Sequence, residues 1–425
     1  MSKSRRSPRT ESGPRLPEVQ QVELSEKHIH LRLWLTIAFA VVGVGLLVFA
    51  VRGFFSAQDG WKEIDVTTSG GLNCASEFRF RYELGAGELS ANQEYRQISQ
   101  LYTTATETLY REFHLDEGFE DVHNLYYLNR HPNEVVSVSD LLYDAFSQVQ
   151  AHHSRALYLA PVYSLYRELF RCEDGEEAKK LDPMMNPELV EFVQELSALA
   201  NDPEAVELEL LGENQVRLRV SEAYLQYAQE NAITNYIDFF WMTNAFGADY
   251  IAQTMIDAGF TNGVITSYDG YTRCLDQRGT DYSYQLYDRD GNTVYTAGSL
   301  RYTGPTSFVF FKNYERGTLD VLHYYELEGG QFRTAYLDPA DGRSKCALPQ
   351  LLGYSSQVGC AELMLSLAPV YLADQFQPET LDALHSRGVE TVYPQGSHCL
   401  VYTEAGAQIE DLYDRNGVTY TAKQK

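Results

Sequence analysis

The chain has 425 residues, of which 44% are hydrophobic and 13% aromatic, so it can bury a sizeable core and is not globally disordered. Asp and Glu number 59 against 34 Lys and Arg, which gives a formal net charge of -25 at pH 7. A charge of this sign repels other polyanions, and we expect no nucleic-acid partner.

The amino-terminal segment departs from this acidic balance. Residues 1–30 are polar and rich in Ser, Pro and Arg, which predicts a disordered tail. Leu33 to Val51 then carry no charge, and as a helix they span roughly 28 Å, close to the hydrocarbon thickness of a bilayer. We predict one transmembrane helix over residues 31–55, with the basic tail cytoplasmic and the remainder extracytoplasmic, at the cell membrane.

A cleaved signal peptide is the alternative interpretation of the apolar run. The segment Phe55-Ser56-Ala57 puts a large residue where cleavage needs a small one, so an uncleaved anchor is favoured. Residues 56–65 are interpreted as a linker. No linker-like composition follows, and residues 66–425 are therefore expected to form a single domain.

The first half of this domain contains a strand followed by three helices and a hairpin. SEFRFRYEL, residues 76–84, alternates apolar and polar positions as a strand does. Apolar residues recur at helical spacing from Tyr95 to Leu109 and from Leu141 to Val149. NPELVEFVQELSALA begins with Asn186 as a helix N-cap, and VELELLGENQVRLRV is typical of a hairpin.

The second half mixes the same kinds of element. IDFFWMTNAFGADYIAQTMIDAGFTNG, residues 237–263, predicts a strand ending at Asp238, a helix and a stop at Gly259. LYDRDGNTVYTA and LYDRNGVTYTA, which start at Leu286 and Leu412, each predict a two-residue hairpin turn. A helix over CAELMLSLAPVYLA and a helix-then-strand over PETLDALHSRGVETVY complete an α+β fold.

Six cysteines lie after the apolar run, and none forms a C-x-x-C pair or a spacing typical of zinc ligands. Six cysteines allow fifteen disulfide pairings, between which the sequence does not choose. Disulfides and free thiols therefore both stay open.

Six segments follow one another along the chain in this order: NLYYLN, ALYLAPVYSLYREL, the turn and helix from Asp238 to Asp249, KNYERG, YLDPADGR and CAELMLSLAPVYLA. In this order they resemble the FAD:protein FMN transferases, the ApbE-type flavin transferases. That family has a D-x-G-G-x-x-K-G-x-x-x-D motif at a strand-to-helix turn, and Asp238 and Asp249 stand at its two acidic positions. YLDPADGR retains Asp338 of the family's H-I-x-D-P-x-T-G motif, and the other four segments are weaker matches.

The resemblance implies an ApbE-like fold, FAD and Mg²⁺ as cofactors, and transfer of FMN to a partner protein. By family position, the residues for FAD are Asp238, Asn244, Asp249, Asp269 and Asp338. Glu362 and Ser366 stand where the family holds Mg²⁺ with an aspartate and a threonine. They are one helical turn apart and both offer hard oxygen ligands, although an i, i+4 hydrogen-bonded pair is the plainer interpretation.

The motif positions themselves are altered. Phe240 and Trp241 replace the two glycines, Asn244 replaces the lysine, and Ala335 replaces the histidine of the last motif. A pyrophosphate is held by backbone N–H groups that glycine lets approach closely, together with a cation that shares the charge. We expect the aromatic side chains to fill the space of the dinucleotide, and we assign no catalytic residue.

Three functions remain open at this stage. The first is a pseudoenzyme that acts as a binding or accessory module beside a membrane protein partner. The second is a working FAD:protein FMN transferase with a divergent Mg²⁺ site. The third is a noncovalent receptor for a flavin or another small ligand, with Phe240 and Trp241 as an aromatic platform.

Overall fold

The computed structural model describes residues 34–35, 37–39, 41–43, 58–67, 71–291, 293–317, 320, 322–328, 330–403, 406–414 and 418–425. The chain divides into two compact units, Met1–Ser56 and Ala57–Lys425. In the first unit, the described residues are helical. The expected tail 1–30 and most of the expected span 31–55 lie outside the described residues. Among those that are described, no helix is both long and apolar enough to cross a membrane, so the span stays a prediction.

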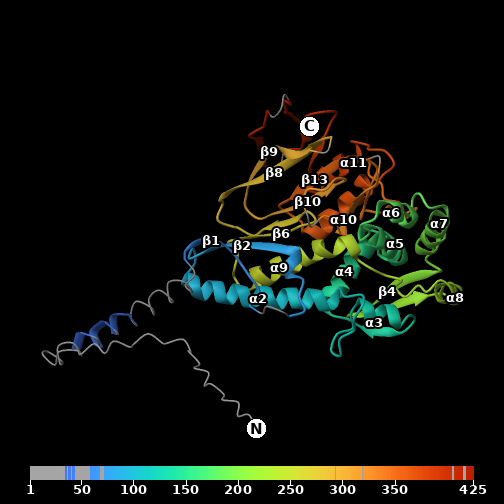
Figure 1. Cartoon of the computed structure of the whole chain (residues 1–425), viewed down its shortest axis with the longest axis horizontal. Coiled ribbons are helices and arrows are strands. Elements are labelled where there is room, and N and C mark those ends of the chain that lie inside the picture. Colours follow the sequence, from blue (N-terminus) through green and yellow to red (C-terminus); the bar gives the residue numbers. More distant parts are fainter. Residues whose placement is uncertain are drawn as a thin grey trace, which may run out of the picture. The chain divides into compact units, whose positions relative to one another are not determined.

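A nine-stranded sheet forms the centre of the second unit (Figure 1). Its neighbouring strands are antiparallel except for the last pair, which is parallel. In spatial order the strands are β1 (Gly60–Glu63), β2 (Phe78–Leu84), β6 (Gly263–Ser267), β7 (Tyr271–Cys274), β10 (Thr306–Lys312), β13 (Gln350–Ser355), β14 (Glu390–Pro394), β15 (Cys399–Tyr402) and β17 (Thr421–Gln424).

Different elements cover the two faces of this sheet. Helices α9 (Thr243–Asp257) and α10 (Cys360–Tyr371) pack on one face, and the long helix α2 (Ala91–Glu112) packs on α9. The other face carries a three-stranded sheet of β8 (Asp281–Asp290), β9 (Thr293–Thr303) and β16 (Gln408–Glu410).

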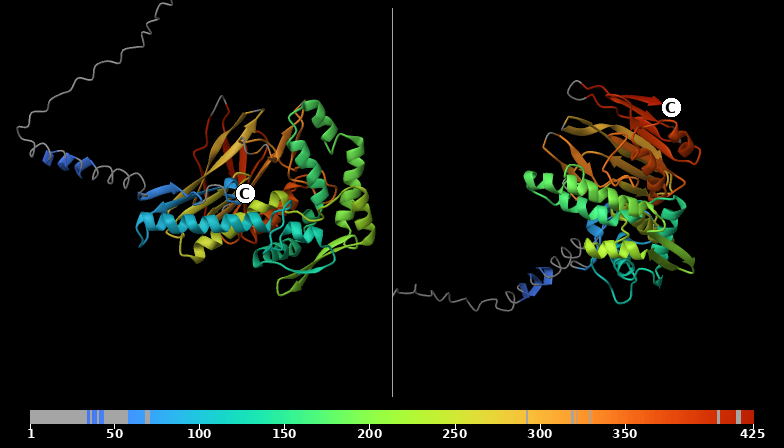
Figure 2. Two further views of the ribbon diagram at one scale, coloured as in Figure 1. Left: turned by 60° about the horizontal axis from the view of Figure 1, so that its bottom comes forward. Right: turned by 90° about the vertical axis from the view of Figure 1, so that its right-hand side faces the viewer.

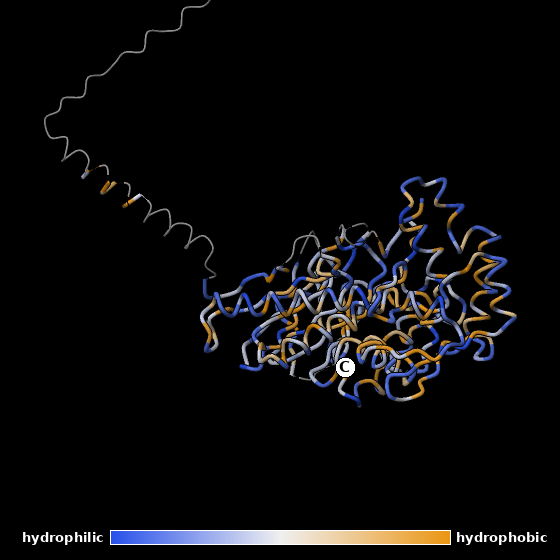
Figure 3. The backbone as a smooth tube through the Cα atoms, turned by 90° about the horizontal axis from the view of Figure 1, so that it is seen from below, coloured by the Kyte–Doolittle hydropathy of each residue, from blue (hydrophilic) through white to orange (hydrophobic). Residues whose placement is uncertain are grey.

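Strand β10 shows how the two cores arise. All seven of its residues are buried, because it lies in the middle of the sheet between the two layers. Phe308 and Phe310 point into the core shared with the three-stranded sheet, whereas Val309 and Phe311 point into the core shared with the helices. Figure 3 shows the hydrophobic stretches running through the interior of the unit.

The remaining elements lie mainly at the end of the body away from β1, as Figures 1 and 2 agree. They include a small sheet with the order β3-β5-β4 and a two-stranded ribbon, β11 with β12. Their bounds are β3 (Val135–Ser137), β4 (Val206–Gly212), β5 (Gln215–Val220), α3 (Leu125–Arg130), α4 (Asp140–Ala151), α5 (Ala160–Phe170), α6 (Gly175–Leu181), α7 (Pro187–Asn201), α8 (Glu222–Glu230), β11 (Tyr324–Glu326), β12 (Phe332–Thr334) and α11 (Thr380–His385). Three 3₁₀ turns are η1 (Ala75–Glu77), η2 (Ala156–Leu159) and η3 (Phe240–Met242).

Most sequence-based elements are confirmed. The strand after Ser76 is β2, the three predicted helices of the first half are α2, α4 and α7, and Asn186 caps α7 by accepting the N–H of Glu188. The hairpin of β4 and β5 turns at Glu213 and Asn214, both with positive φ, and β8 pairs with β9 as expected.

Two expectations are corrected. The linker expected over residues 56–65 is too long, because residues 60–63 form β1 and pair with β2. No regular strand leads into Asp238. The turn expected in the segment from Leu412 falls on residues 415–417, which lie outside the described residues; β16 and β17, on either side of this segment, pair with β9 and β15. All six cysteines are free thiols.

Candidate functional site

The turn before α9 is held by residues far away in the chain rather than by a sheet. The side-chain amide of Asn129 accepts the N–H groups of Tyr236 and Ile237, at 2.8 and 3.0 Å, and donates to the carbonyl of Ile237 at 2.9 Å. The N–H of Asp238 donates to the carbonyl of Leu157. These bonds satisfy the backbone N–H and C=O groups of the extended segment, which in a sheet would pair with a neighbouring strand.

Asp238 fixes the bend itself. Its carboxylate is almost fully buried, accepts the N–H of Phe240 at 2.8 Å and forms an ion pair with Arg167 at 2.6 Å. Phe240 adopts a φ of +43°, a left-handed conformation that side chains rarely adopt. The backbone thus takes a glycine-like turn at a position where the sequence has phenylalanine.

The three aromatic residues of this turn have different environments. Phe239 is fully buried against Phe113, Phe146 and Phe246. Trp241 is 3% exposed, its ring packs edge-on to Phe311 and Tyr336, and its carbonyl accepts the hydroxyl of Tyr271 at 2.9 Å.

Phe240 is only partly buried and lines a cavity of about 290 Å³. The expectation that aromatic bulk converts the cleft into core is therefore right for Trp241 and wrong for Phe240.

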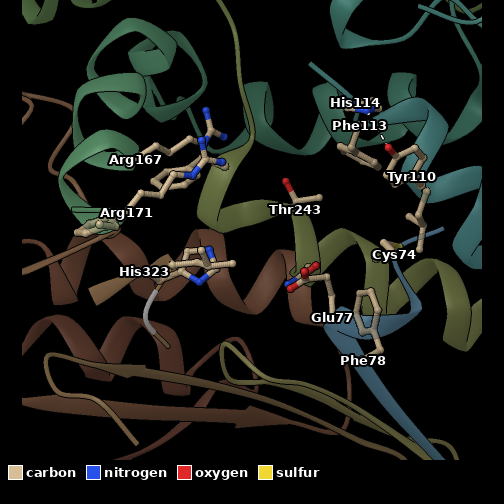
Figure 4. Close-up of a pocket in the computed structure, with 16 residues that line it drawn as sticks. Cys74, Glu77, Phe78, Tyr110, Phe113, His114, Arg167, Arg171, Thr243 and His323 are labelled. Atoms are coloured by element: carbon tan, nitrogen blue, oxygen red, sulfur yellow. Dashed lines mark hydrogen bonds between the residues drawn. The ribbon is translucent and has the colours of Figure 1, made fainter. Parts of the chain in front are cut away.

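This cavity lies beside the first turns of α9 and is also lined by α2, α5 and η1 (Figure 4). We call it the α9 cavity. Arg167, Arg171 and His323 approach from one side, Thr243 lies between, and the remaining labelled residues approach from the other side. The lining residues are Cys74, Glu77, Phe78, Leu109, Tyr110, Phe113, His114, Arg167, Phe170, Arg171, Phe240, Thr243, Asn244, Gly247, Leu322 and His323.

Burial shifts the pKa values of three groups that line the α9 cavity, those of Glu77, His323 and Cys74. Burial raises the pKa of Glu77, although a hydrogen bond from Asn244 opposes the shift. Burial lowers the pKa of His323 to about 4, with a smaller contribution from the charge of Lys312, so its imidazole is neutral at pH 7. Burial also raises the pKa of the Cys74 thiol to about 12, so this cysteine is a poor nucleophile.

Asn244 and Asp269, two residues predicted from the motif, do lie together. The amide of Asn244 donates to one oxygen of Asp269 at 3.1 Å, and the hydroxyl of Ser267 donates to the other at 2.5 Å. Burial raises the pKa of Asp269 to about 7, and the nearby charge of Glu77 adds to the shift. The family lysine would supply a cation here, whereas Asn244 supplies a neutral amide.

Glu362 and Ser366 lie one turn apart on α10, as expected, but other groups engage the glutamate. His152, at the end of α4, lies 2.8 Å from Oε2 of Glu362, and the hydroxyl of Ser366 donates to Oε1 at 3.5 Å. Within the described parts of the chain, no three His, Cys, Asp or Glu side chains form a group that could hold a metal ion.

Asp249 serves as a helix cap. Its two carboxylate oxygens accept the N–H groups of Cys360 and Ala361, both at 2.8 Å, at the start of α10. Arg273 lies 3.4 Å from the same carboxylate. Asp249 and Glu362 line a second cavity, of about 560 Å³, with Arg273.

Asp338 belongs to neither cavity. One oxygen accepts the N–H of Ala340 at 2.9 Å, and the other pairs with Lys345 at 2.5 Å. Gly342 closes this turn with a φ of +68°. In this chain the YLDPADGR segment therefore forms a turn that Lys345 and the side-chain amide of Asn201, which donates to the carbonyl of Pro339, hold in place.

The structure thus divides the predicted site residues among four places. Asn244 lines the α9 cavity beside Asp269. Asp238 lies behind this cavity and pairs with its lining residue Arg167. Asp249 and Glu362 line the second cavity, and Asp338 lies in its separate turn. Reasoning from the sequence missed Arg167, Arg171, Glu77 and His323. The two arginines were detectable as cations four residues apart in a chain dominated by acids.

The site residues do not fit a bound Mg²⁺ or FAD pyrophosphate. The oxygens of Asp249 are taken by backbone N–H groups, and Glu362 is paired with His152. Trp241 fills space in the core, and no lysine stands at position 244.

An α+β body with helices on one face of a mostly antiparallel sheet defines the structural class of the chain. No model of a known protein family matches the chain, and no curated protein sequence does. Solved structures do match. The ApbE protein of Thermotoga maritima is 12% identical with a TM-score of 0.53, and the match covers 79% of this chain and 94% of that chain.

Two further matches are weaker. The flavin transferase ApbE of Vibrio cholerae is 10% identical with a TM-score of 0.49, and the match covers 79% of this chain and 94% of that one. The flavinyl transferase ApbE of Pseudomonas stutzeri is 10% identical with a TM-score of 0.48, and the match covers 80% of this chain and 92% of that one. The Thermotoga structure carries the conclusion that this chain has an ApbE-like fold.

Proposed function

We propose that the chain is a membrane-anchored, extracytoplasmic protein with an ApbE-like fold that does not transfer FMN and acts by binding. One observation carries the proposal. The carboxylates at the family's motif positions are engaged by the protein itself, Asp249 by the first N–H groups of α10 and Glu362 by His152.

The charges around the turn before α9 support the proposal that the chain does not transfer a phosphoryl group. A transferred phosphoryl group needs cations or a metal ion aligned with it, because its transition state is stabilised almost entirely by charge and position. At the corresponding turn, Asn244 is neutral and its amide is committed to Asp269. Glu77, whose carboxylate lines the same cavity, would repel a pyrophosphate.

The cellular setting of the proposal rests on the sequence. Residues 31–55 would anchor the chain with its basic tail in the cytoplasm, and the acidic body would lie outside. An anchored body without group-transfer chemistry is suited to an accessory role beside a membrane protein, which is the partner we propose.

An FMN-transfer assay tests the proposal. The full chain is incubated with FAD, Mg²⁺ and an acceptor protein that the Vibrio cholerae flavin transferase modifies, and that enzyme serves as the positive control. We expect no covalently bound FMN on the acceptor from this chain. A flavin-fluorescent acceptor band on a denaturing gel would establish the alternative, a working transferase with a divergent site.

A further inference from the structure

We propose that the α9 cavity binds a compact planar aromatic molecule that carries a single anionic group. This inference rests on the proposed function, in which the chain acts by binding, and it names the class of ligand that the α9 cavity takes in place of a dinucleotide. Four features carry it: an unpaired arginine, a partly buried aromatic ring that lines the cavity, a neutral histidine and the limited volume.

The anionic group is recognised from the side of α5. Arg167 is already balanced by Asp238 at 2.6 Å. Arg171 directly follows α5, is exposed, and makes no side-chain hydrogen bond or ion pair with any described residue. Figure 4 shows both arginines on the same side of the cavity. A guanidinium with free donors binds a carboxylate or phosphate through two parallel hydrogen bonds.

The planar part is recognised by Phe240. Its ring is held by the guanidinium of Arg167, 4.3 Å from the ring centroid, and by Tyr163 at a centroid distance of 4.9 Å. Phe240 still borders the cavity, so part of its surface is free to contact a ligand ring. Offset and edge-to-face contacts between aromatic rings are favourable beyond the burial of their area.

His323 adds polar recognition next to this ring. Its centroid lies 5.8 Å from that of Phe240, and its ring nitrogens have no hydrogen-bond partner among the described residues. Because burial lowers the pKa of His323 to about 4, the ring is neutral at pH 7 and offers one donor and one acceptor.

Volume and charge restrict the ligand to one ring system and one anionic group. At about 290 Å³, the cavity lies just below the usual range for small-molecule pockets, about 300–1,000 Å³. Glu77 and Asn244 line it as well, so a second anionic group would meet a carboxylate. A hydrogen-bond donor on the ligand is favoured there instead.

Calorimetric titration of the full chain tests the proposal, with 2-naphthoate as the probe. The uncharged 2-naphthamide has the same ring and serves as the matched ligand. We expect saturable binding of one 2-naphthoate per chain and binding of 2-naphthamide at least tenfold weaker, because only the carboxylate engages Arg171.

Two variants locate the site. Arg171→Gln should weaken 2-naphthoate binding at least tenfold. Arg387→Gln is the control, because Arg387 is likewise an exposed arginine just past the end of a helix but does not line the cavity, and we expect a change below twofold. Thermal unfolding of both variants verifies that they remain folded.

The proposal is overturned if 2-naphthoate does not bind saturably, if 2-naphthamide binds equally well, or if the two variants behave alike. These readouts are independent of FMN transfer. A chain that fails to bind naphthoate can still lack transferase activity, and a chain that transfers FMN would contradict the proposed function whatever the titration gives.

Discussion

Phe240 keeps a backbone conformation that suits glycine. Its φ of +43° costs a residue with a Cβ about 1–2 kcal/mol. The bond from its N–H to Asp238 and the contacts of its ring with Arg167 and Tyr163 hold the residue in place.

A pair of substitutions measures this strain. Phe240→Ala and Phe240→Gly both remove the ring, but only alanine keeps the Cβ at a positive φ. We therefore expect Phe240→Gly to be more stable than Phe240→Ala by about 1 kcal/mol in chemical denaturation. Phe239, with a φ of -79°, is the control, and there alanine should be the more stable of the two. The opposite order at position 240 would contradict a strained turn.

Asp269 links stability to pH. Burial raises its pKa from the usual value near 4 to about 7, so in this window the folded chain keeps a proton that the unfolded chain releases. The free energy of unfolding therefore decreases as pH rises from about 4 to about 7. At about 1.4 kcal/mol per pKa unit, the decrease is at most roughly 4 kcal/mol.

Asp269→Asn tests this linkage, because it removes the titration and keeps a hydrogen-bonding side chain. We expect the free energy of unfolding of the variant to change less between about pH 5 and about pH 8 than that of the unchanged chain. Asp144→Asn, on the exposed face of α4, is the matched control and should keep the original dependence. Identical pH profiles for Asp269→Asn and the unchanged chain would refute the assignment.

At the scale of the element, helices were easier to predict than strand partners. The start of α7 at Pro187 and the stop after α9 at Gly259 follow from local chemistry, namely an N-cap and a glycine with positive φ. The extended segment before Asp238 resembles a strand, but its partner is the side chain of Asn129, more than a hundred residues away. No local pattern could show that contact.

The segment from Leu412 shows the same limit on predicting strand partners. A turn dipeptide indicates where the chain reverses, but it does not decide which strands then pair. The strands on either side of this segment, β16 and β17, pair with β9 and β15, which belong to different sheets.

The cap of α10 by Asp249 joins two helices and yields a prediction at this scale. Asp249→Ala should lower the free energy of unfolding by about 2 kcal/mol, because the N–H groups of Cys360 and Ala361 lose their acceptor. Asp249→Asn keeps one acceptor oxygen and should lose less. If Mg²⁺ raises the melting temperature of the unchanged chain and not that of Asp249→Ala, the carboxylate is a metal ligand and the cap interpretation is wrong.

For the whole molecule, the α+β class and the continuous body followed from the sequence, but the layering did not. Strand β10, TSFVFFK, is buried on both faces, so it lacks the alternation by which a strand is recognised. The candidate site was likewise only partly predictable. The family resemblance gave Asn244 and Asp269, whereas Arg167 lies on α5 and Arg171 directly follows it, and only the tertiary structure shows which helix faces meet.

The body also has a core of its own, which bears on the anchor. Among the described residues, its clustered buried residues run from Ile64 to Tyr420, all within the second unit. We therefore expect the second unit to fold without residues 1–56, so that anchoring can be tested separately from folding.

Deletion of residues 1–56 should convert the chain from a membrane-bound protein to a freely sedimenting one. The full chain carries nineteen uncharged residues, Leu33 to Val51, and we expect it in the membrane pellet after an alkaline carbonate wash. The truncated chain should stay in the supernatant with an unchanged melting temperature, because its core is complete.

In intact cells whose outer face is exposed to protease, the body should be digested while a tag on residue 1 is protected, since the basic flank keeps that end in the cytoplasm. Release of the full-length chain by carbonate would contradict the membrane anchor. A tag on residue 1 that the protease reaches would contradict the predicted orientation.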